Sequence, residues 1–468
     1  MITAYVMDDH NTLISLTHVC THWRRVITTC PTVWTHVAFG GEGMPDSLVK
    51  LFFERAGRCA LDVYISAPVR RPGRPAREQT IPTPSAGQRI VTLSINHPWA
   101  QIFNILNGWA GTFSSLRMLD IVADEPLPSS RPPAFFGDTL KELKILGLAV
   151  PGLDYIRAPN LTVLNLYEQY QTPCSASKLL DFLEAAPALV EVLIYVDSTV
   201  VIDFLSPHRT ITLPHAQFIS LSIGRSPQLA PHIICPSSRI ASFGDAFPDS
   251  LTADIFPPNL FELLGQWSVG IIDRVMMRVL DQDVYKVCSL KFYSPSGAWF
   301  QVACEPEHIP DLPLEDPVLE WTFSILFNQA VSALSSLPLN DVTSFSIDTE
   351  SSLPDPTADS TEIARRLAEL FAKCLKLHTV VLENHLPACL SALSQDRTPP
   401  IQVLVIKHPE DVLWEEFIER ITEVAHVRCS RDIPLQRIEI VTASEENPRI
   451  EQLETWVQEV RIVRKPPS

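Results

Sequence analysis

The sequence predicts an α/β protein in which short strands alternate with helices and stack into a curved parallel sheet, forming an elongated solenoid. Three observations indicate this fold. An apolar hexamer recurs, helical periodicity lies between its copies, and the chain of 468 residues is long for a single compact core. A unit of one strand and one helix cannot cover its own apolar face, so neighbouring units must stack.

The hexamer has the form apolar-x-x-apolar-x-apolar. Its first six copies are IVTLSI at 90–95, LRMLDI at 116–121, LKELKI at 140–145, LTVLNL at 161–166, LVEVLI at 189–194 and FISLSI at 218–223. Five more follow: VCSLKF at 287–292, VTSFSI at 342–347, LHTVVL at 377–382, IQVLVI at 401–406 and LQRIEI at 435–440. Because 46% of the chain is apolar, the hexamer alone would recur by chance.

The spacing of the hexamers favours a repeat protein. The first six copies start 26, 24, 21, 28 and 29 residues apart, which predicts a leucine-rich-repeat-like solenoid. The repeats are irregular, since the asparagine that usually follows each strand in such repeats is not visible. Residues 245–285 and 306–335 are expected to form longer loops or helical insertions. An ordinary α/β domain whose strands share this spacing is the alternative.

The fifth position of the hexamer is polar in eight of the eleven copies. Such alternation predicts strands with one face in the core and one face exposed. We expect Asp120, Lys144 and Asn165 to line that exposed face and to bind a target protein. Between the hexamers, helices are predicted at residues 177–185, 361–375 and 411–425, each with an apolar stripe at helical spacing.

Near the start of the chain, residues 11–30 are predicted to form one helix. At about 100° per residue, its apolar stripe contains Leu13, Leu16, Val19, Cys20, Trp23, Val26 and Ile27. Pro31 ends this helix, Trp34 follows in a turn, and Val37 and Phe39 alternate as in a short strand.

Two chemical interpretations of this segment are weak. His18 and His22 are four residues apart, as in zinc-binding histidine pairs, but the segment supplies no third ligand on the same face. Cys20 falls on the apolar stripe, where burial would raise its pKa and make it a poor nucleophile. We therefore expect no metal site and no catalytic residue here.

The motif Val19-Cys20-x-x-Trp23-Arg24 followed by Pro31-x-x-Trp34 resembles the second half of an F-box-like domain. The segment LFFERAGRCALDVYIS at 51–66 is similar to the helix, Glu-Arg-Ser/Ala-Gly turn and strand that follow the F-box in a large fungal set of such proteins. The resemblance covers about 50 residues. It implies that a Skp-family adaptor of cullin–RING ubiquitin ligases binds this region. The adaptor-binding residues it implies are Leu16, Val19, Cys20, Trp23, Val26, Ile27, Pro31 and Trp34.

The resemblance departs from the family at one point. F-box domains usually begin with a Leu-Pro-x-Glu segment and a first helix, and here only MITAYVMDDH precedes the predicted helix. The N-terminal part of the F-box is therefore expected to be missing or reduced, with adaptor binding weakened or lost unless the sequence starts late.

The F-box resemblance, the proline content and the hexamers divide the sequence into four expected segments. These are a partial F-box-like helical unit at 1–40, a helix–strand connection at 41–66, a Pro/Arg-rich loop at 67–89 and an irregular repeat array at 90–468. The loop contains Arg70, Arg71, Arg74 and Arg77, and its prolines exclude a helix or a central strand.

Bulk properties narrow the function. The formal charge of −17 argues against a general nucleic-acid or anionic-membrane binder. Ten scattered cysteines without a Cys-x-x-Cys pair favour reduced thiols, and neither a signal peptide nor a membrane span is visible. Nucleotide-binding and hydrolase motifs are absent, and no cofactor is implied.

We therefore expect an intracellular, cytoplasmic or nuclear, non-enzymatic protein. Its partners would be a Skp-family adaptor with its cullin–RING ligase and an unknown protein target, with neither nucleic acid nor membrane among them. The alternatives are a leucine-rich-repeat interaction scaffold unrelated to ubiquitination, and an enzyme with an unrecognised site.

Overall fold

The computed structural model describes twenty stretches of the chain. These are residues 10–39, 46–67, 84–108, 112–123, 135–136, 138–146, 156–168, 175–196, 209–222, 229–245, 256, 260, 264, 271–282, 285–304, 323–351, 359–383, 387–407, 413–442 and 450–464. They form two compact units, Met1–Phe218 and Ile219–Ser468. Arg70, Arg71, Arg74 and Arg77 of the predicted Pro/Arg-rich loop lie outside the described residues.

Unit 1 starts with helices and then alternates strands with helices or turns. Its main elements are α2 (His10–Val19), α3 (Thr21–Thr29), η1 (Pro31–Trp34), β1 (His36–Phe39), α4 (Asp46–Ala56), β2 (Leu61–Ser66), η2 (Pro84–Arg89), β3 (Ile90–Asn96), α5 (Trp99–Gly108), β4 (Met118–Val122), β6 (Glu142–Leu146), β8 (Val163–Glu168), α6 (Ala176–Glu184) and β9 (Glu191–Val196). The short strands β5 (Phe135–Phe136) and β7 (Ile156–Arg157) pair with each other, and β10 (Ile211–Thr212) follows β9.

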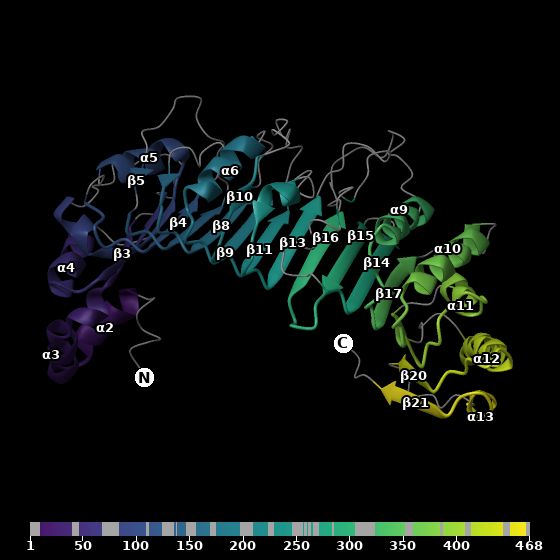
Figure 1. Ribbon diagram of the computed structural model, residues 1–468. Helices are drawn as coiled ribbons and strands as arrows, with labels where there is room; N and C mark the ends of the chain where they lie inside the picture. Colours follow the sequence, from purple (N-terminus) through teal and green to yellow (C-terminus); the bar gives the residue numbers. More distant parts are fainter. Residues whose placement is uncertain are drawn as a thin grey trace, which may run out of the picture. The chain divides into compact units, whose positions relative to one another are not determined.

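The strands of unit 1 pair in chain order and in parallel: β1, β2, β3, β4, β6, β8 and β9. Helices α5 and α6 lie on one face of this sheet (Figure 1). This serial parallel pairing agrees with the predicted strand–helix stacking.

The apolar positions of the hexamer form the core of unit 1. Position four stacks in register as Leu93, Leu119, Leu143, Leu164 and Val192, and each of these side chains is fully buried. Burial of one such side chain stabilises the fold by about 1.5–3 kcal/mol. The parallel strands therefore share one continuous hydrophobic row.

A main-chain ladder links the strand entries. The amide of the residue just before each strand donates to the carbonyl of the equivalent residue one repeat earlier, as in Lys141 N to Arg117 O at 2.8 Å and Thr162 N to Lys141 O at 2.7 Å. The Thr162 hydroxyl also donates to Lys141 O, at 2.8 Å. These bonds connect successive repeats at the start of each strand.

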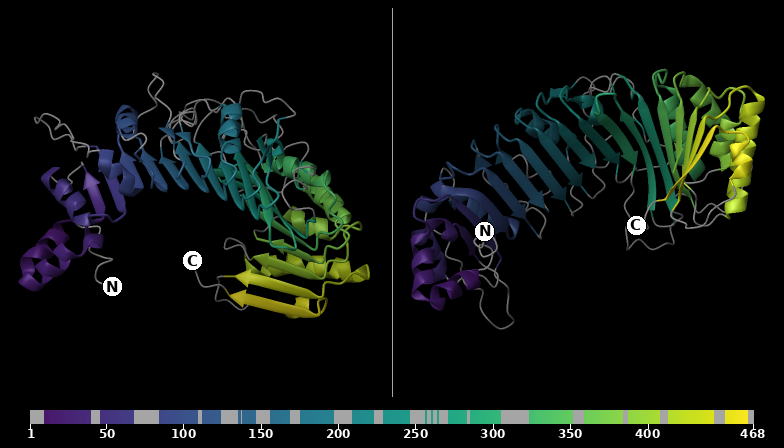
Figure 2. Two further views of the ribbon diagram at one scale, coloured as in Figure 1. Left: turned by 60° about the vertical axis from the view of Figure 1, so that its left-hand side comes forward. Right: turned by 90° about the horizontal axis from the view of Figure 1, so that it is seen from below.

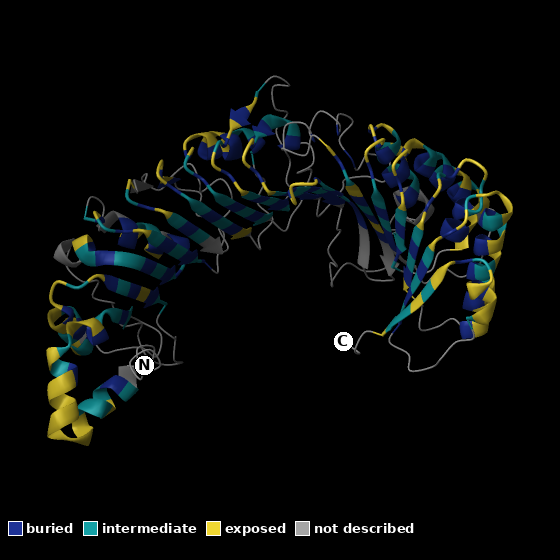
Figure 3. Cartoon of the chain, turned by 60° about the horizontal axis from the view of Figure 1, so that its bottom comes forward, coloured by how far each residue is buried: buried dark blue, intermediate teal, exposed yellow. Residues whose placement is uncertain are grey.

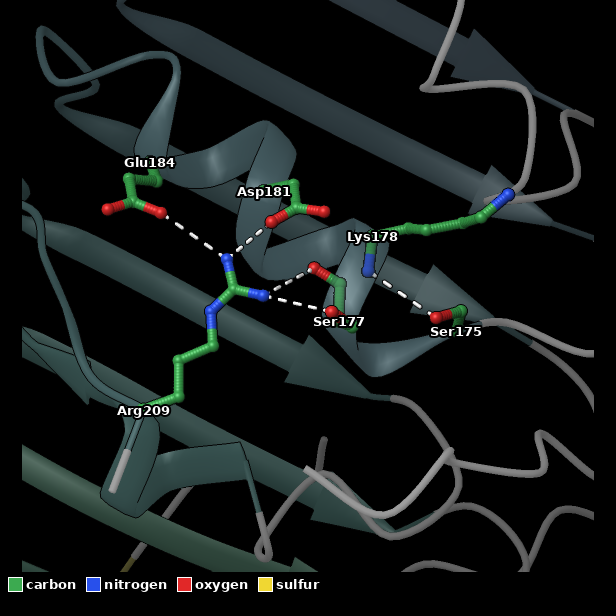
Figure 4. Close-up of polar contacts among 6 residues, drawn as sticks. All are labelled: Ser175, Ser177, Lys178, Asp181, Glu184 and Arg209. Carbon is green, nitrogen blue, oxygen red and sulfur yellow. Dashed lines mark hydrogen bonds and ion pairs between the residues drawn. The ribbon is translucent and has the colours of Figure 1, made fainter. Parts of the chain in front are cut away.

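Arg209 ties the segment before β10 to helix α6 (Figure 4). Its guanidinium donates to the Ser177 hydroxyl at 2.9 Å, to Asp181 Oδ1 at 2.5 Å and to Glu184 Oε2 at 3.3 Å. These hydrogen bonds, that to Asp181 first, raise the pKa of Arg209. Ser175 caps the helix by accepting from Lys178 N at 3.4 Å.

Unit 2 contains an antiparallel insert between two runs of parallel strands. Its elements are β11 (Phe218–Ser222), η4 (Ala230–His232), β12 (Ile233–Ile234), β13 (Ile240–Asp245), β14 (Arg274–Gln282), β15 (Tyr285–Tyr293), β16 (Trp299–Cys304), α9 (Phe323–Ser335), β17 (Ser344–Ser351), α10 (Asp359–Lys373), β18 (Thr379–Leu382), α11 (Pro387–Leu393), β19 (Val403–Lys407), α12 (Trp414–Ser430), β20 (Arg437–Thr442), α13 (Glu451–Glu454) and β21 (Glu459–Arg464).

The insert changes the strand order of unit 2. β13 pairs in parallel with β16, β15 is antiparallel to both β16 and β14, and β14 pairs in parallel with β17. From β17 onward, β18, β19, β20 and β21 add in chain order and in parallel. Helices α9 to α12 lie on one face of this sheet (Figure 2).

Two predictions for unit 2 need correction. The hexamer at 287–292 forms β15, which runs against its neighbours, because the apolar pattern of a strand is the same in either direction. Residues 245–285 were expected to form loops or helices, yet residues 274–282 form strand β14. The helices predicted at 177–185, 361–375 and 411–425 correspond to α6, α10 and α12.

Arg428 on helix α12 is fully buried and reaches toward the end of helix α11. Its guanidinium donates to Leu393 O and Pro399 O, both at 2.9 Å, and so satisfies carbonyls at and beyond the end of α11. Burial lowers the pKa of Arg428 to about 10, which leaves the side chain charged at neutral pH. One long side chain therefore joins two successive repeats.

Replacing Arg428 should loosen this part of unit 2. Arg428→Ala leaves one buried and one half-buried carbonyl without their donor and opens a cavity, so the free energy of opening of α11 and α12 should fall by about 3 kcal/mol. Amide hydrogen exchange of these helices measures it. Arg420→Ala on the same helix removes only a partly exposed ion pair with Glu416 and should cost less than about 1 kcal/mol. Equal effects of the two variants would contradict the capping role.

Candidate protein-interaction surfaces

The helix predicted at residues 11–30 is two helices. Cys20 has extended backbone angles, φ −159° and ψ 169°, and separates α2 from α3. Arg24 Nε donates to Thr17 O at 2.9 Å, which satisfies a carbonyl left free at the end of α2. The predicted single stripe is therefore wrong, and the residues on it divide between two helix surfaces.

One group of these residues builds the local core. Trp34 is 2% exposed, its Nε1 donates to Ile27 O at 2.8 Å, and its ring meets that of Phe52 on α4 edge to face at 4.8 Å. Ile27 and Leu13 are also buried. These side chains hold α3 and η1 against α4 and are not available to a partner.

The second group faces outward. Val19 is 64% exposed, Val26 42% and Trp23 37%. Cys20 and Pro31 are exposed and Leu16 is half-buried. Figure 3 shows α3 exposed along most of its length. We name Val19, Cys20, Trp23 and Val26 the α3 surface. Among the eight predicted adaptor-binding residues, the structure thus separates exposed from structural side chains.

The break at Cys20 also separates the two histidines. His18 lies on α2 and His22 on α3, so the pair lacks the single helix that an i,i+4 ligand pair requires. The described residues contain no cluster of three or more histidine, cysteine or carboxylate side chains that could hold a metal ion. Burial raises the pKa of Cys235, Cys374 and Cys389 to about 12, which makes these thiols poor nucleophiles.

The three predicted target-binding residues lie side by side in unit 1. Asp120 is in register with Lys144, and Lys144 is in register with Asn165, on consecutive strands β4, β6 and β8. Ser94 on β3 extends the row and donates to Asp120 Oδ2 at 3.2 Å. The buried leucines alternate with these residues, so the row lies on the face opposite the helices.

A second row beside the first adds acidic side chains. Glu142, two residues before Lys144, lies 2.7 Å from the Lys144 ammonium, and the hydrogen bond between them raises the pKa of Lys144. The charges of Asp120 and Glu191 act in the same direction. We name Asp120, Lys144, Asn165, Glu142 and Glu191 the unit 1 face. It presents one lysine among three carboxylates.

Two tyrosines flank the unit 1 face. Tyr64 on β2 is 44% exposed and is in register with Ser94, and Tyr167 on β8 is 39% exposed, two residues beyond Asn165. Exposed tyrosines beside charged groups are typical of protein-binding surfaces. Glu142, Glu191 and the tyrosines were not singled out from the sequence. Glu142 and Glu191 occupy position three of their hexamers. Because side chains two residues apart point to the same face of a strand, position three shares a face with position five, and the sequence pattern could have identified both glutamates.

The fold and these surfaces define an α/β repeat protein with a largely parallel sheet, helices on one face and polar side chains on the other. No protein-family model and no curated protein matches this chain. Among solved structures, it is similar to the TLR13–ssRNA13 complex, with a TM-score of 0.31 and 10% sequence identity over 81% of this chain and 43% of that one. This chain thus spans less than half of that chain's length. In the described part of the chain, no helix is long and apolar enough to span a membrane.

The two tryptophans near the start of the chain should behave differently when replaced. Trp34→Ala removes a buried ring and its hydrogen bond, so the amides of β1 and α4 should lose about 3–5 kcal/mol of protection free energy. Trp23→Ala removes a partly exposed ring and should cost less than about 1 kcal/mol. Hydrogen exchange measures both. A larger loss for Trp23→Ala would place that ring in the core.

The pKa of Lys144 tests the electrostatics of the unit 1 face. Folding raises the pKa of Lys144 above 10.5. The charged lysine therefore stabilises the folded state below pH 10.5, and this stabilisation is lost as the pH rises through the pKa that Lys144 has in the folded state. Glu142→Gln should lower the pKa of Lys144 because the charged acceptor is gone, as followed by NMR titration of the lysine ε-carbon. Glu419→Gln, far along the chain at an exposed position of α12, should leave the pKa of Lys144 unchanged. An unchanged pKa in Glu142→Gln would exclude the pairing.

Proposed function

We propose that this protein is a non-enzymatic substrate receptor of a Skp–cullin–F-box ubiquitin ligase, which acts inside the cell. In this proposal a Skp-family adaptor binds the α3 surface and a target protein binds the unit 1 face. The adaptor supplies the link to the cullin–RING ligase, where the ubiquitin chemistry takes place. This chain itself needs no cofactor for that role.

The exposure of Trp23 beside Val19 and Val26 is the observation that supports adaptor binding best. Three large apolar side chains, one at the end of α2 and two on α3, are exposed to water, while Trp34 and Ile27 nearby complete the local core. Burying an apolar side chain of this size in an interface contributes roughly 1.5–3 kcal/mol. The same residues carry the F-box resemblance, Val19-Cys20-x-x-Trp23-Arg24.

The unit 1 face supports the second half of the proposal. Its charged and polar side chains come from several consecutive strands and are flanked by exposed tyrosines. Recognition spread over neighbouring strands suits a protein target, because such interfaces combine aromatic contacts with polar groups that set specificity. A repeat scaffold without a ubiquitin link would use this face in the same way, and it is the second candidate function.

Adaptor binding distinguishes the two candidates. The full chain should bind a purified Skp-family adaptor in a titration by isothermal calorimetry. Trp23→Asp should weaken that binding at least tenfold because it places a charge in the apolar contact. Leu375→Asp is a matched control, since Leu375 is an exposed apolar residue of unit 2, at 70%, and should leave adaptor binding unchanged.

Two results would overturn the ubiquitin-ligase role. One is no adaptor binding by the full chain or by a version extended with a Leu-Pro-x-Glu helix, which would favour the scaffold. The other is adaptor binding that Trp23→Asp leaves intact while the variant keeps its circular dichroism spectrum. Binding by the extended version alone would retain the receptor role and assign the missing contact to that first helix.

A further inference from the structure

The antiparallel insert of unit 2 gathers aromatic and basic side chains on the face away from its buried core. In the registers of β14, β15 and β16, Tyr293 is opposite both Trp299 and Arg274, and Lys291 lies two residues before Tyr293. The intervening Phe292 and its cross-strand partner Phe300 are fully buried. We name Arg274, Lys291, Tyr293 and Trp299 the β14–β16 cluster.

The cations of this cluster rest on aromatic rings. The Lys291 ammonium is 3.6 Å from the centre of the Trp299 ring and 5.4 Å from that of Tyr293. The Arg274 guanidinium carbon is 4.8 Å from the centre of the Tyr293 ring. These are cation–π distances. They place both cations over the same tyrosine.

Carboxylates contribute little to neutralising these cations. In the part of the chain that the structure describes, Lys291 forms no ion pair, and burial lowers its pKa. Arg274 has only Asp273, its neighbour in sequence, at 3.7 Å. By contrast, Arg278 on the same strand is paired with Asp348 at 3.0 Å. A half-buried lysine without a counter-ion, beside an exposed arginine with one long ion pair, favours an anion that could approach both from outside.

The side chains in register with Lys291 and Arg274 are uncharged, while the charge of Glu383 reaches Tyr293. Lys291 is in register with Gln301 on one side and Met276 on the other, and Arg274 is in register with Ser344. Gln301, Met276 and Ser344 are half-buried. They offer hydrogen-bonding and apolar contacts to a ligand without repelling a negative charge.

We propose that the β14–β16 cluster docks an acidic segment of a partner protein, with a carboxylate between Lys291 and Arg274 and an apolar side chain against Trp299 and Tyr293. Tryptophan, tyrosine and arginine are the residues that contribute most to protein interfaces, and here they lie together on adjacent strands. Carboxylate binding would replace the weak cation–π contacts of Lys291 with a charge-assisted hydrogen bond.

The chemistry of the cluster favours a protein segment over nucleic acid. A protein that binds nucleic acid neutralises many phosphates with its lysines and arginines. This cluster offers only two cations, on a protein with a formal charge of −17. Such a field would repel a long polyanion, whereas one or two carboxylates on a neutral or basic partner could still be accommodated. This inference goes beyond the proposed function, because it adds a partner surface in unit 2 that uses neither the α3 surface nor the unit 1 face.

Binding of synthetic peptides to the full chain tests this inference. An array of fluorescein-labelled ten-residue peptides would combine glutamate or aspartate with leucine or phenylalanine in varied order. Matched arrays would carry lysine or glutamine in place of the acids, and a ten-nucleotide single-stranded RNA would be included. Fluorescence anisotropy should show saturable binding for members of the acidic array alone, weakening as salt is raised.

Single variants would then locate the binding. Lys291→Met should raise the dissociation constant of the best acidic peptide at least tenfold, and Trp299→Leu should have a comparable effect. Lys407→Met is the matched control, an exposed lysine of β19 outside the cluster, and should change it less than twofold. Trp23→Asp should leave peptide binding intact, so failure of adaptor docking and failure of this inference are distinguishable.

Several results would overturn the inference. These are no saturable binding by any acidic peptide, preferential binding of the basic array or the RNA, and acidic-peptide binding that Lys291→Met leaves unchanged. If Trp299→Leu unfolds by circular dichroism, Lys291→Met and Lys291→Gln alone decide the outcome.

Discussion

In-register pairing of parallel strands is the constraint on which the rest of this structure depends. When consecutive strands pair without a shift, equivalent positions of every repeat fall into straight rows across the sheet. Leu93, Leu119 and Leu143 form one such row and are fully buried. The residue that follows each leucine along its strand then points to the opposite face, so Ser94, Asp120 and Lys144 form a row there. A slip by one residue would reverse both faces at once, so burial of the leucines also aligns the polar residues.

Much of this arrangement could be predicted from the sequence, because it depends on local period and spacing. The hexamers locate the strands, their apolar positions locate the core, and position five locates the row that contains Asp120, Lys144 and Asn165. Strand direction could not be predicted, since a period of two is the same read either way. The proline and glycine of SPSG at 294–297 indicate a turn in the sequence, and this turn, where Gly297 has φ +84°, forms the β15–β16 hairpin. The helix break at Cys20 was also missed, because helical periodicity alone does not reveal a single extended residue.

Exposure separates structural from interacting residues in a way that composition cannot. Trp34 and Trp23 are eleven residues apart and belong to the same motif, yet one ring is buried against Phe52 and the other is partly exposed on α3. The insert in unit 2 shows the same principle on a sheet. There the antiparallel turn brings Trp299 opposite Tyr293, outside the hydrophobic core. In both places, apolar side chains remain available to a partner because the neighbouring core is already filled.

Chemical bridging of cysteine pairs would test the register most directly. In the double variant Asp120→Cys/Lys144→Cys, and equally in Lys144→Cys/Asn165→Cys, the two thiols lie on adjacent strands and on one face. Dibromobimane should therefore bridge each pair, as detected by mass spectrometry of the linked peptides. The pair Lys144→Cys/Leu164→Cys places the thiols on opposite faces and should remain unbridged. Bridging of this last pair, without bridging of the first two, would contradict the in-register stacking.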